Sequence, residues 1–172
     1  MTKDEILVEL KKNTVGVIYF IDSHHIEELK LSKAEKWNSV QHLEHLLRSI
    51  QPLNKALRIP VPGLRVLFGK RNRPERSYHE VVKKYEDNLE AGGKASGRYI
   101  PQKNSSINKL KNKYREQSDS LMGIIEKWKE EDMSTCLLPH PLLGKLTIRE
   151  MLYFTVYHTQ HHLQLMEANL AT

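Results

Sequence analysis

The sequence is poor in cysteine and in long apolar runs, and each shortage excludes a class of protein. Cys136 is the only cysteine, so no internal disulfide framework is available and a reducing compartment, the cytoplasm, is expected. The longest apolar run, Val15–Ile21, is far shorter than the roughly 20 residues that span a bilayer. Residues 1–5 are polar and acidic, unlike a signal peptide. We therefore expect neither a membrane protein nor a secreted or fibrous one.

What the chain does contain is typical of one soluble domain. It has 172 residues, of which 39% are apolar and 28% charged, and its mean hydropathy is −0.57. A chain of this length can bury a substantial core without disulfides or metals to hold it together. The sequence predicts a single domain over residues 1–172.

The net charge of +6 is unevenly distributed. Residues 61–115 contain 14 Lys and Arg against 5 Asp and Glu, and the rest of the chain is slightly acidic. No nucleic-acid-binding motif accompanies these charges, and charge alone gives only salt-sensitive, non-specific binding. We therefore do not expect a nucleic-acid partner; the basic segment forms a solvated surface or helps to recognise an anionic small molecule.

Apolar residues recur at intervals of three and four in four long stretches, which predicts four amphipathic helices. The first runs from Ile6 to Ile21, and the second follows a cap at Asn38 and extends to Leu53. The third starts at Asn104 or Ser105 and its stripe reaches Trp128.

A capping box, Thr147 to Glu150, opens the fourth helix. Residues 59–77 are predicted to be irregular except for one helical turn, and residues 132–146 to be a loop. Residues 78–89 are predicted to form a short helix, and no strand is predicted. These elements predict an all-α four-helix bundle with a long crossover between helices 2 and 3.

The histidines are the most informative polar residues. His158 and His162 are one turn apart on the inner face of the fourth helix, so both imidazoles can reach one metal ion. The second helix carries His42 and His45. Spacing alone leaves two interpretations open, a metal site and a set of hydrogen-bonded core histidines, although buried imidazoles without a ligand need other partners.

Three segments of the chain resemble the DinB/YfiT-like superfamily. They are Trp37–Leu46, with its W-N-x-x-x-x-x-x-H-L pattern, His140–Glu150, with H-P-x-x-G-x-L-T-x-x-E, and the H-x-x-x-H of His158–His162. Asn38 stands where the family often has Ser or Thr. The resemblance implies an up-down-down-up bundle and a divalent transition metal, zinc or nickel, held by His45, His158 and His162. His42 is the competitor of His45 for the first position.

Three imidazoles would leave one position of the metal open, where it can acidify a bound water or thiol. The resemblance accordingly implies a hydrolase or a low-molecular-weight thiol S-transferase with a small-molecule substrate, either anionic or a thiol, and a homodimer. The alternative is a non-catalytic bundle with a structural metal or a role in stress-response interactions. Gln41 and Thr155 are candidates for the pocket lining, whereas Glu44, Cys136 and Glu150 have no catalytic role that the sequence supports.

Overall fold

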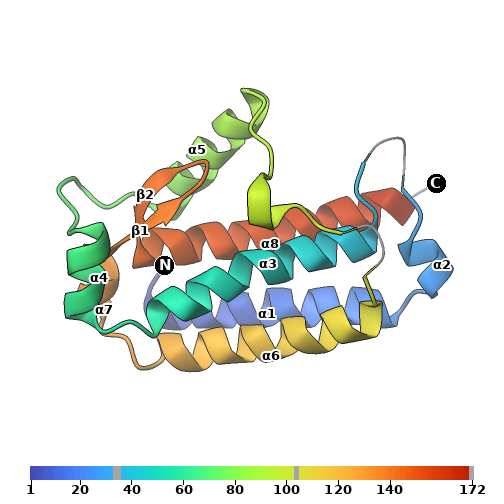
Figure 1. Cartoon of the computed structure of the whole chain (residues 1–172), viewed down its shortest axis with the longest axis horizontal. Helices are drawn as coiled ribbons and strands as arrows, with labels where there is room; N and C mark the ends of the chain where they lie inside the picture. Colours follow the sequence, from blue (N-terminus) through green and yellow to red (C-terminus); the bar gives the residue numbers. More distant parts are fainter. Residues whose placement is uncertain (33–35, 103–104, 171–172) are drawn as a thin grey trace.

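The computed structural model describes residues 1–32, 36–102 and 105–170, and within these ranges the chain is mostly helical. Eight α-helices and one short 3₁₀ helix, η1, are present in the described part, together with one two-stranded hairpin (Figure 1). The elements are α1 (Lys3–Asp22), α2 (Ile26–Leu29), α3 (Ser39–Leu57), α4 (Val61–Phe68), α5 (Tyr78–Glu90), η1 (Gly97–Tyr99), α6 (Ile107–Ile125), α7 (Glu130–Thr135), β1 (Leu137–His140), β2 (Gly144–Thr147) and α8 (Ile148–Leu170).

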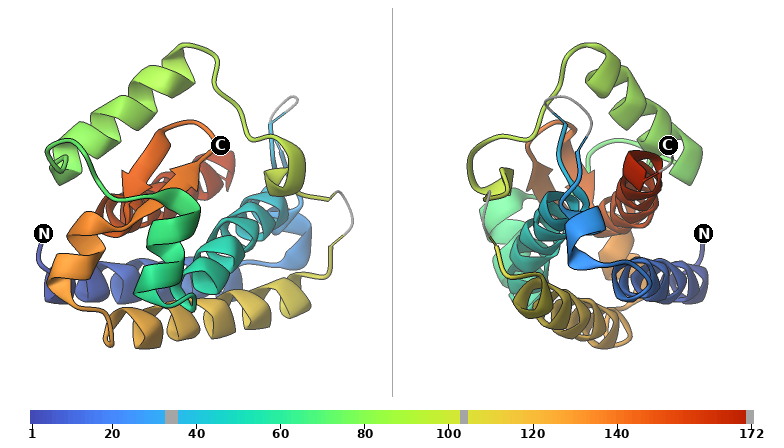
Figure 2. Two further views of the ribbon diagram at one scale, coloured as in Figure 1. Left: turned by 60° about the vertical axis from the view of Figure 1, so that its left-hand side comes forward. Right: turned by 90° about the vertical axis from the view of Figure 1, so that its right-hand side faces the viewer.

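Four long helices, α1, α3, α6 and α8, enclose the main core. Helix α3 packs against α6 and α8, and α1 packs against the same two helices; the end-on view in Figure 2 shows the four around a common interior. The apolar stripes expected for these helices are the buried faces, with Ile6, Leu43 and Leu121 almost fully enclosed. No helix in the described ranges is both long enough and apolar enough to cross a membrane.

The helix starts follow the capping signals in the sequence. The Asn38 side chain accepts a hydrogen bond from the Gln41 amide, and the Asn38 amide donates one to the Gln41 side chain. Thr147 and Glu150 are related in the same reciprocal way, which confirms the predicted cap at Asn38 and the predicted capping box at Thr147. The third predicted helix begins slightly later than expected, at Ile107 after Ser106; Asn104 lies outside the described residues.

Two predictions for the connections are wrong. The stretch containing Pro139 and Gly144 is an antiparallel hairpin, with Leu137 opposite Thr147 and His140 opposite Gly144. Its strands have only four residues each and one contains a proline, so no alternating pattern was visible. Gly144 has a φ of 74°, a conformation that glycine adopts without strain. Residues 61–68 form a helix because Pro60 and Pro62 stand at its start, where a missing amide costs nothing.

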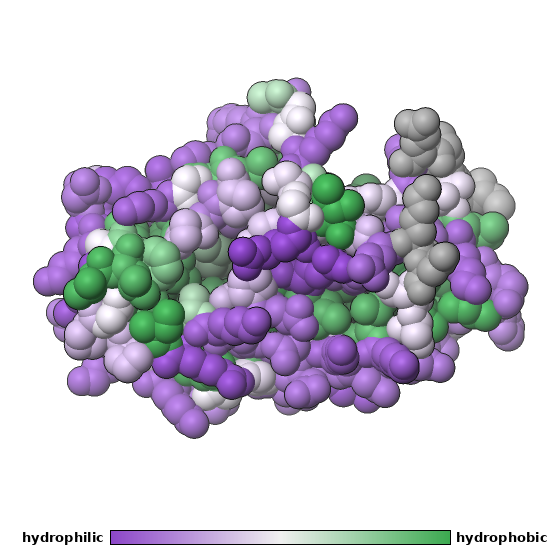
Figure 3. Space-filling model, in the orientation of Figure 1, coloured by the Kyte–Doolittle hydropathy of each residue, from purple (hydrophilic) through white to green (hydrophobic). Residues whose placement is uncertain are grey.

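The predicted crossover lies over one side of the four long helices. Helix α5, confirmed close to its expected limits, packs on α8, and η1 packs on α3 (Figures 1 and 2). The surface in this orientation is largely hydrophilic, with hydrophobic residues gathered over α4 (Figure 3), where Val66 and Leu67 are exposed. The crossover and the hairpin pack on α3 and α8 and, together with them, line a large cavity.

Candidate metal centre

His45, His158 and His162 come together in the interior between α3 and α8. Their side chains are buried, and one ring nitrogen from each lies within 4.8 Å of the other two. The His158 Nε2 atom is 3.1 Å from Nε2 of His45 and 3.0 Å from Nε2 of His162. The structure thus juxtaposes the three residues expected from the sequence, and the group could hold a metal ion; that they bind one stays a prediction.

The orientation of His45 is fixed by a residue far away in the sequence. Its Nδ1 atom lies 2.7 Å from the carbonyl oxygen of Tyr99 in η1, so the ring donates its Nδ1 proton there. A neutral His45 then has only a lone pair at Nε2, the atom that faces His158. Sequence reasoning missed Tyr99 because a backbone carbonyl in an irregular segment carries no sequence signal.

His42 lies behind His162 and is not a member of the converging group. The two Nδ1 atoms are 2.8 Å apart, and His42 is also hydrogen-bonded to the backbone of Trp37. When His162 carries its proton on Nδ1 and donates it to His42, its Nε2 has a free lone pair. The competitor weighed for the first ligand position is therefore a hydrogen-bond partner of the last one.

Burial keeps these imidazoles neutral. Burial and the neighbouring His45 and His161 lower the pKa of His42 to about 4. Burial also lowers the pKa of His45. For His158 and His162, burial together with the surrounding histidines places the pKa well below its ordinary value of 6.5. Neutral imidazole is the form that ligates transition metals.

The donor set fits a metal on chemical grounds. When His45 and His162 both present Nε2 lone pairs, the single Nε2 of His158 can donate a proton to only one of them. At least one buried lone pair then lacks a donor within the group, and a cation bound by all three nitrogens would satisfy it. The hydrogen bonds to Tyr99 and His42 are of the kind that usually orient metal-ligating histidines.

Aromatic rings surround the three histidines. The Trp37 ring lies 5.0 Å from that of His45 and stacks at 6.3 Å on that of His162. Phe154 stacks on His158 with ring centroids 4.7 Å apart. These rings restrict the access of water to the nitrogens from two sides.

One side of the group opens into a large cavity of about 1180 Å³. Its wall comes from α3, α5, α8, strand β1, the hairpin turn and the segment from Lys94 to Ile100, and it includes Thr155, as expected. Gln41 is not among the lining residues; its side chain caps α3. His161 is half-buried and lines the same cavity.

The other candidates are occupied elsewhere. Glu44 is buried and binds Arg48, Ser105 and the Gln102 amide. Glu150 pairs with Arg73, and Cys136 is fully buried. His140 accepts hydrogen bonds from the amides of Leu142 and Leu143 in the turn of the hairpin.

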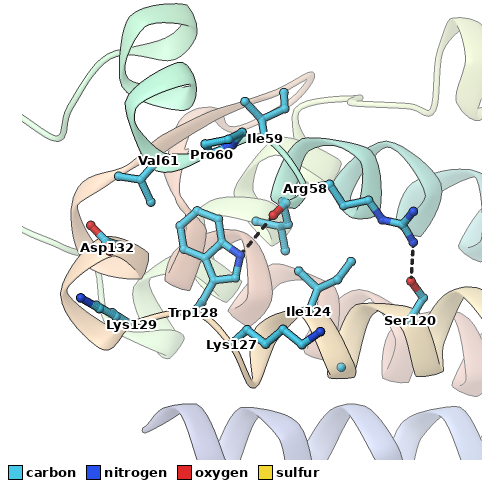
Figure 4. A pocket seen from close by; sticks show the side chains of 12 residues that line it. Arg58, Ile59, Pro60, Val61, Ser120, Ile124, Lys127, Trp128, Lys129 and Asp132 are labelled. Carbon is cyan, nitrogen blue, oxygen red and sulfur yellow. Dashed lines mark hydrogen bonds between the residues drawn. The ribbon is translucent and has the colours of Figure 1, made fainter.

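A second cavity, of about 730 Å³, lies where the C-terminal ends of α3 and α6 meet α7. The Trp128 indole donates to the Leu57 carbonyl at 3.2 Å, and Arg58 donates to Ser120 at 3.0 Å (Figure 4). None of the described residues that line it is a histidine or a cysteine, and its one carboxylate, Asp132, is paired with Arg65. Of these two cavities, the one at the three histidines is the one whose described lining includes a group of potential metal ligands.

Comparison with known proteins agrees with the location of the candidate site at the three histidines. A sequence profile of the DinB superfamily matches residues 7–166 of the chain. No curated protein and no solved structure matches the chain significantly. The matched range contains α3 and most of α8, and with them every residue of the histidine group.

Proposed function

The chain belongs to the DinB superfamily, and on that premise we propose that it is a metal-dependent enzyme that acts on a small molecule. The proposed reaction is hydrolysis or transfer of a low-molecular-weight thiol, and the proposed metal is zinc or nickel. The proposed ligands are His45, His158 and His162.

The observation that carries the proposal is the convergence of three neutral imidazoles at the wall of a large cavity. The converging group contains no fourth His, Cys, Asp or Glu from the described chain. Structural zinc sites generally use four protein ligands, whereas catalytic sites use three and keep one position for water or substrate. The ligand number and the adjoining cavity thus favour chemistry over a purely structural metal.

A divalent metal in this position supplies Lewis acidity toward a water or a thiol. The protein's part is to hold and shield the nitrogens. The Tyr99 carbonyl accepts the Nδ1 proton of His45, and His42 can accept that of His162, which leaves both Nε2 atoms free to bind the metal. Trp37 and Phe154 form the apolar surroundings. Such surroundings strengthen electrostatic interactions inside the site.

We also propose that the four long helices form an up-down-down-up bundle. In Figure 1, α1 and α8 run in one direction while α3 and α6 run in the opposite one. The packing of α3 and α1 against both α6 and α8 supports this arrangement. It brings the second and last helices side by side, which is what the histidine group requires.

The first experiment is to measure the metal content of untagged protein by elemental mass spectrometry after dialysis without chelator. We expect about one transition-metal ion per chain. Alanine at position 45, 158 or 162 should abolish binding, whereas His79→Ala, at an exposed histidine of α5, should leave it intact. A wild-type chain that takes up no metal on reconstitution would refute the proposal.

Activity is tested on the metal-loaded protein with two substrate sets, aryl esters for hydrolysis and a small thiol with an aryl halide for transfer. We expect turnover of one set that disappears in the His158→Ala variant. A full complement of metal without turnover of either set would favour a structural metal in a non-catalytic bundle.

A further inference from the structure

Apolar side chains form much of the wall of the cavity next to the histidine group. Helix α3 contributes Leu46, Ile50 and Leu53, the turn of the hairpin contributes Leu142, and α8 contributes Met151 and Phe154. Its volume of about 1180 Å³ exceeds the upper end of the usual range for small-molecule sites, about 1000 Å³. A wall of this kind binds an apolar body by removing it from water.

The charged residues of the lining all have one sign. Lys36, Lys94 and Arg98 line the cavity, and no Asp or Glu is among the described lining residues. Lys94 stands between α5 and η1, Arg98 lies within η1, and neither forms an ion pair with an acidic residue of the described chain. Exposed cations without partners on the wall of an apolar cavity attract an anionic group.

The segment that carries these cations is held firmly in place. Arg48 donates to the Arg98 carbonyl at 3.0 Å, His45 donates to the Tyr99 carbonyl, and Glu44 accepts from the Gln102 amide at 3.1 Å. Three residues of α3 thus fix the backbone from Arg98 to Gln102. The point from which the Arg98 side chain extends therefore has a defined position relative to the apolar wall and to the histidines.

We infer that the substrate is an amphiphilic anion, an apolar chain or ring system with one negatively charged end that pairs with Lys94 and Arg98. The apolar body occupies the wall between α3, the hairpin and α8. This inference rests on the proposed function for its catalytic meaning, but the binding site exists whether or not the metal is catalytic. It assigns part of the basic segment a role in recognition.

The test uses three ligands with the same ten-carbon tail and different heads: decanoate, decan-1-ol and decyltrimethylammonium. Binding to metal-free protein is measured by isothermal titration calorimetry, so that a carboxylate cannot bind through the metal. We expect decanoate to bind most tightly. The double variant Lys94→Gln, Arg98→Gln should weaken decanoate roughly fivefold to tenfold, the size of two solvent-accessible ion pairs, and leave decan-1-ol unchanged.

A matched control and a variant of the apolar wall complete the design. Lys109→Gln with Lys113→Gln removes two exposed cations of α6 that do not line the cavity, and decanoate affinity should be unchanged. Ile100 lines the cavity and is half exposed, so Ile100→Asn should fold and should weaken decanoate and decan-1-ol alike.

Several outcomes would overturn the inference. These are equal binding of all three ligands, no binding of decanoate, or decanoate affinity that is unchanged in the double variant and rises only when the metal is added. The last result would place the anionic end at the histidines. If the protein discriminates between the head groups but binds no metal, the proposed function is refuted and the binding inference stands. If the protein binds metal but does not discriminate between the head groups, the inference alone is refuted.

Discussion

The Nδ1 atoms of His42 and His162 lie 2.8 Å apart in the interior, so only one of the two can carry a proton at that contact. Burial lowers the pKa of both rings, and both are therefore neutral at physiological pH. His162 can then offer its Nε2 lone pair to a metal only while His42 accepts its Nδ1 proton.

Replacing His42 by Ala should weaken metal binding about 10- to 100-fold, the range typical for partners that orient a metal ligand. His162 would lose the acceptor that selects its tautomer, while the three ligands remain. The measurement is competition with a chromophoric chelator, and His79→Ala serves as the control because His79 is exposed. Wild-type affinity in His42→Ala would show that the contact does not orient His162.

Metal binding should stabilise the fold only when all three histidines are present. At a free metal concentration of about 100 times Kd, binding adds about 2.7 kcal/mol to the free energy of unfolding. In a chain of this size that corresponds to a rise in Tm of roughly 5–10 °C. Thermal scans with and without zinc or nickel should show this rise for the wild type and not for His158→Ala. A comparable rise in the variant would mean that the metal binds elsewhere.

Glu44→Ala should loosen the segment around η1. The carboxylate accepts hydrogen bonds from the Gln102 amide at 3.1 Å and the Ser105 hydroxyl at 2.6 Å, and both are lost together. Hydrogen exchange at residues 97–102 should accelerate about tenfold or more, since a hydrogen bond to a charged group is worth about 1.5–3 kcal/mol. Glu116→Ala, at an exposed position of α6, should leave the exchange unchanged. Unaltered protection in Glu44→Ala would show that other contacts hold the segment.

Glu150 should stabilise the protein above its pKa and not below it. Burial opposes ionisation of Glu150, but hydrogen bonds from Arg73 and from the amides of Arg76 and Thr147 outweigh it, so the pKa lies below 4.5. Glu150→Gln should cost about 3 kcal/mol at neutral pH, because it leaves Arg73 without its charge partner.

The sign of the pH dependence follows from this depressed pKa. The stabilisation is complete above the unfolded pKa and is lost as the pH falls through the folded one. Urea titrations of the wild type and Glu150→Gln should therefore converge as the pH falls through the depressed pKa of Glu150 in the folded state. A stability difference that stays constant with pH would rule out the ionised pair as its source.

The long helices and the histidine group could be predicted from the sequence because each rests on local signals. Leu43 and Leu46 belong to a repeat of three and four residues, and His158 and His162 are one turn apart. The family resemblance supplied His45, which spacing alone could not link to α8. These features depend on side-chain identity at fixed intervals along one helix.

The remaining features depend on contacts between distant segments. The hairpin at Leu137–Thr147 is too short to show alternation, and the burial of Glu44 results from pairing with residues 102 and 105. The contact between His45 and the Tyr99 carbonyl involves no side chain of Tyr99. The predictions of a single domain, a homodimer and a cytoplasmic location stay predictions.

The hydrogen bond from His45 to a main-chain carbonyl has a consequence for how this site can change by mutation. Any amino acid at position 99 offers the same oxygen, so substitutions there preserve the ring orientation as long as the backbone keeps its path. Insertions or deletions between Gly93 and Gln102 would shift that oxygen and turn the imidazole away from its neighbours. The orientation of His45 thus tolerates a change of the side chain at position 99, but it is sensitive to the length of the segment between Gly93 and Gln102.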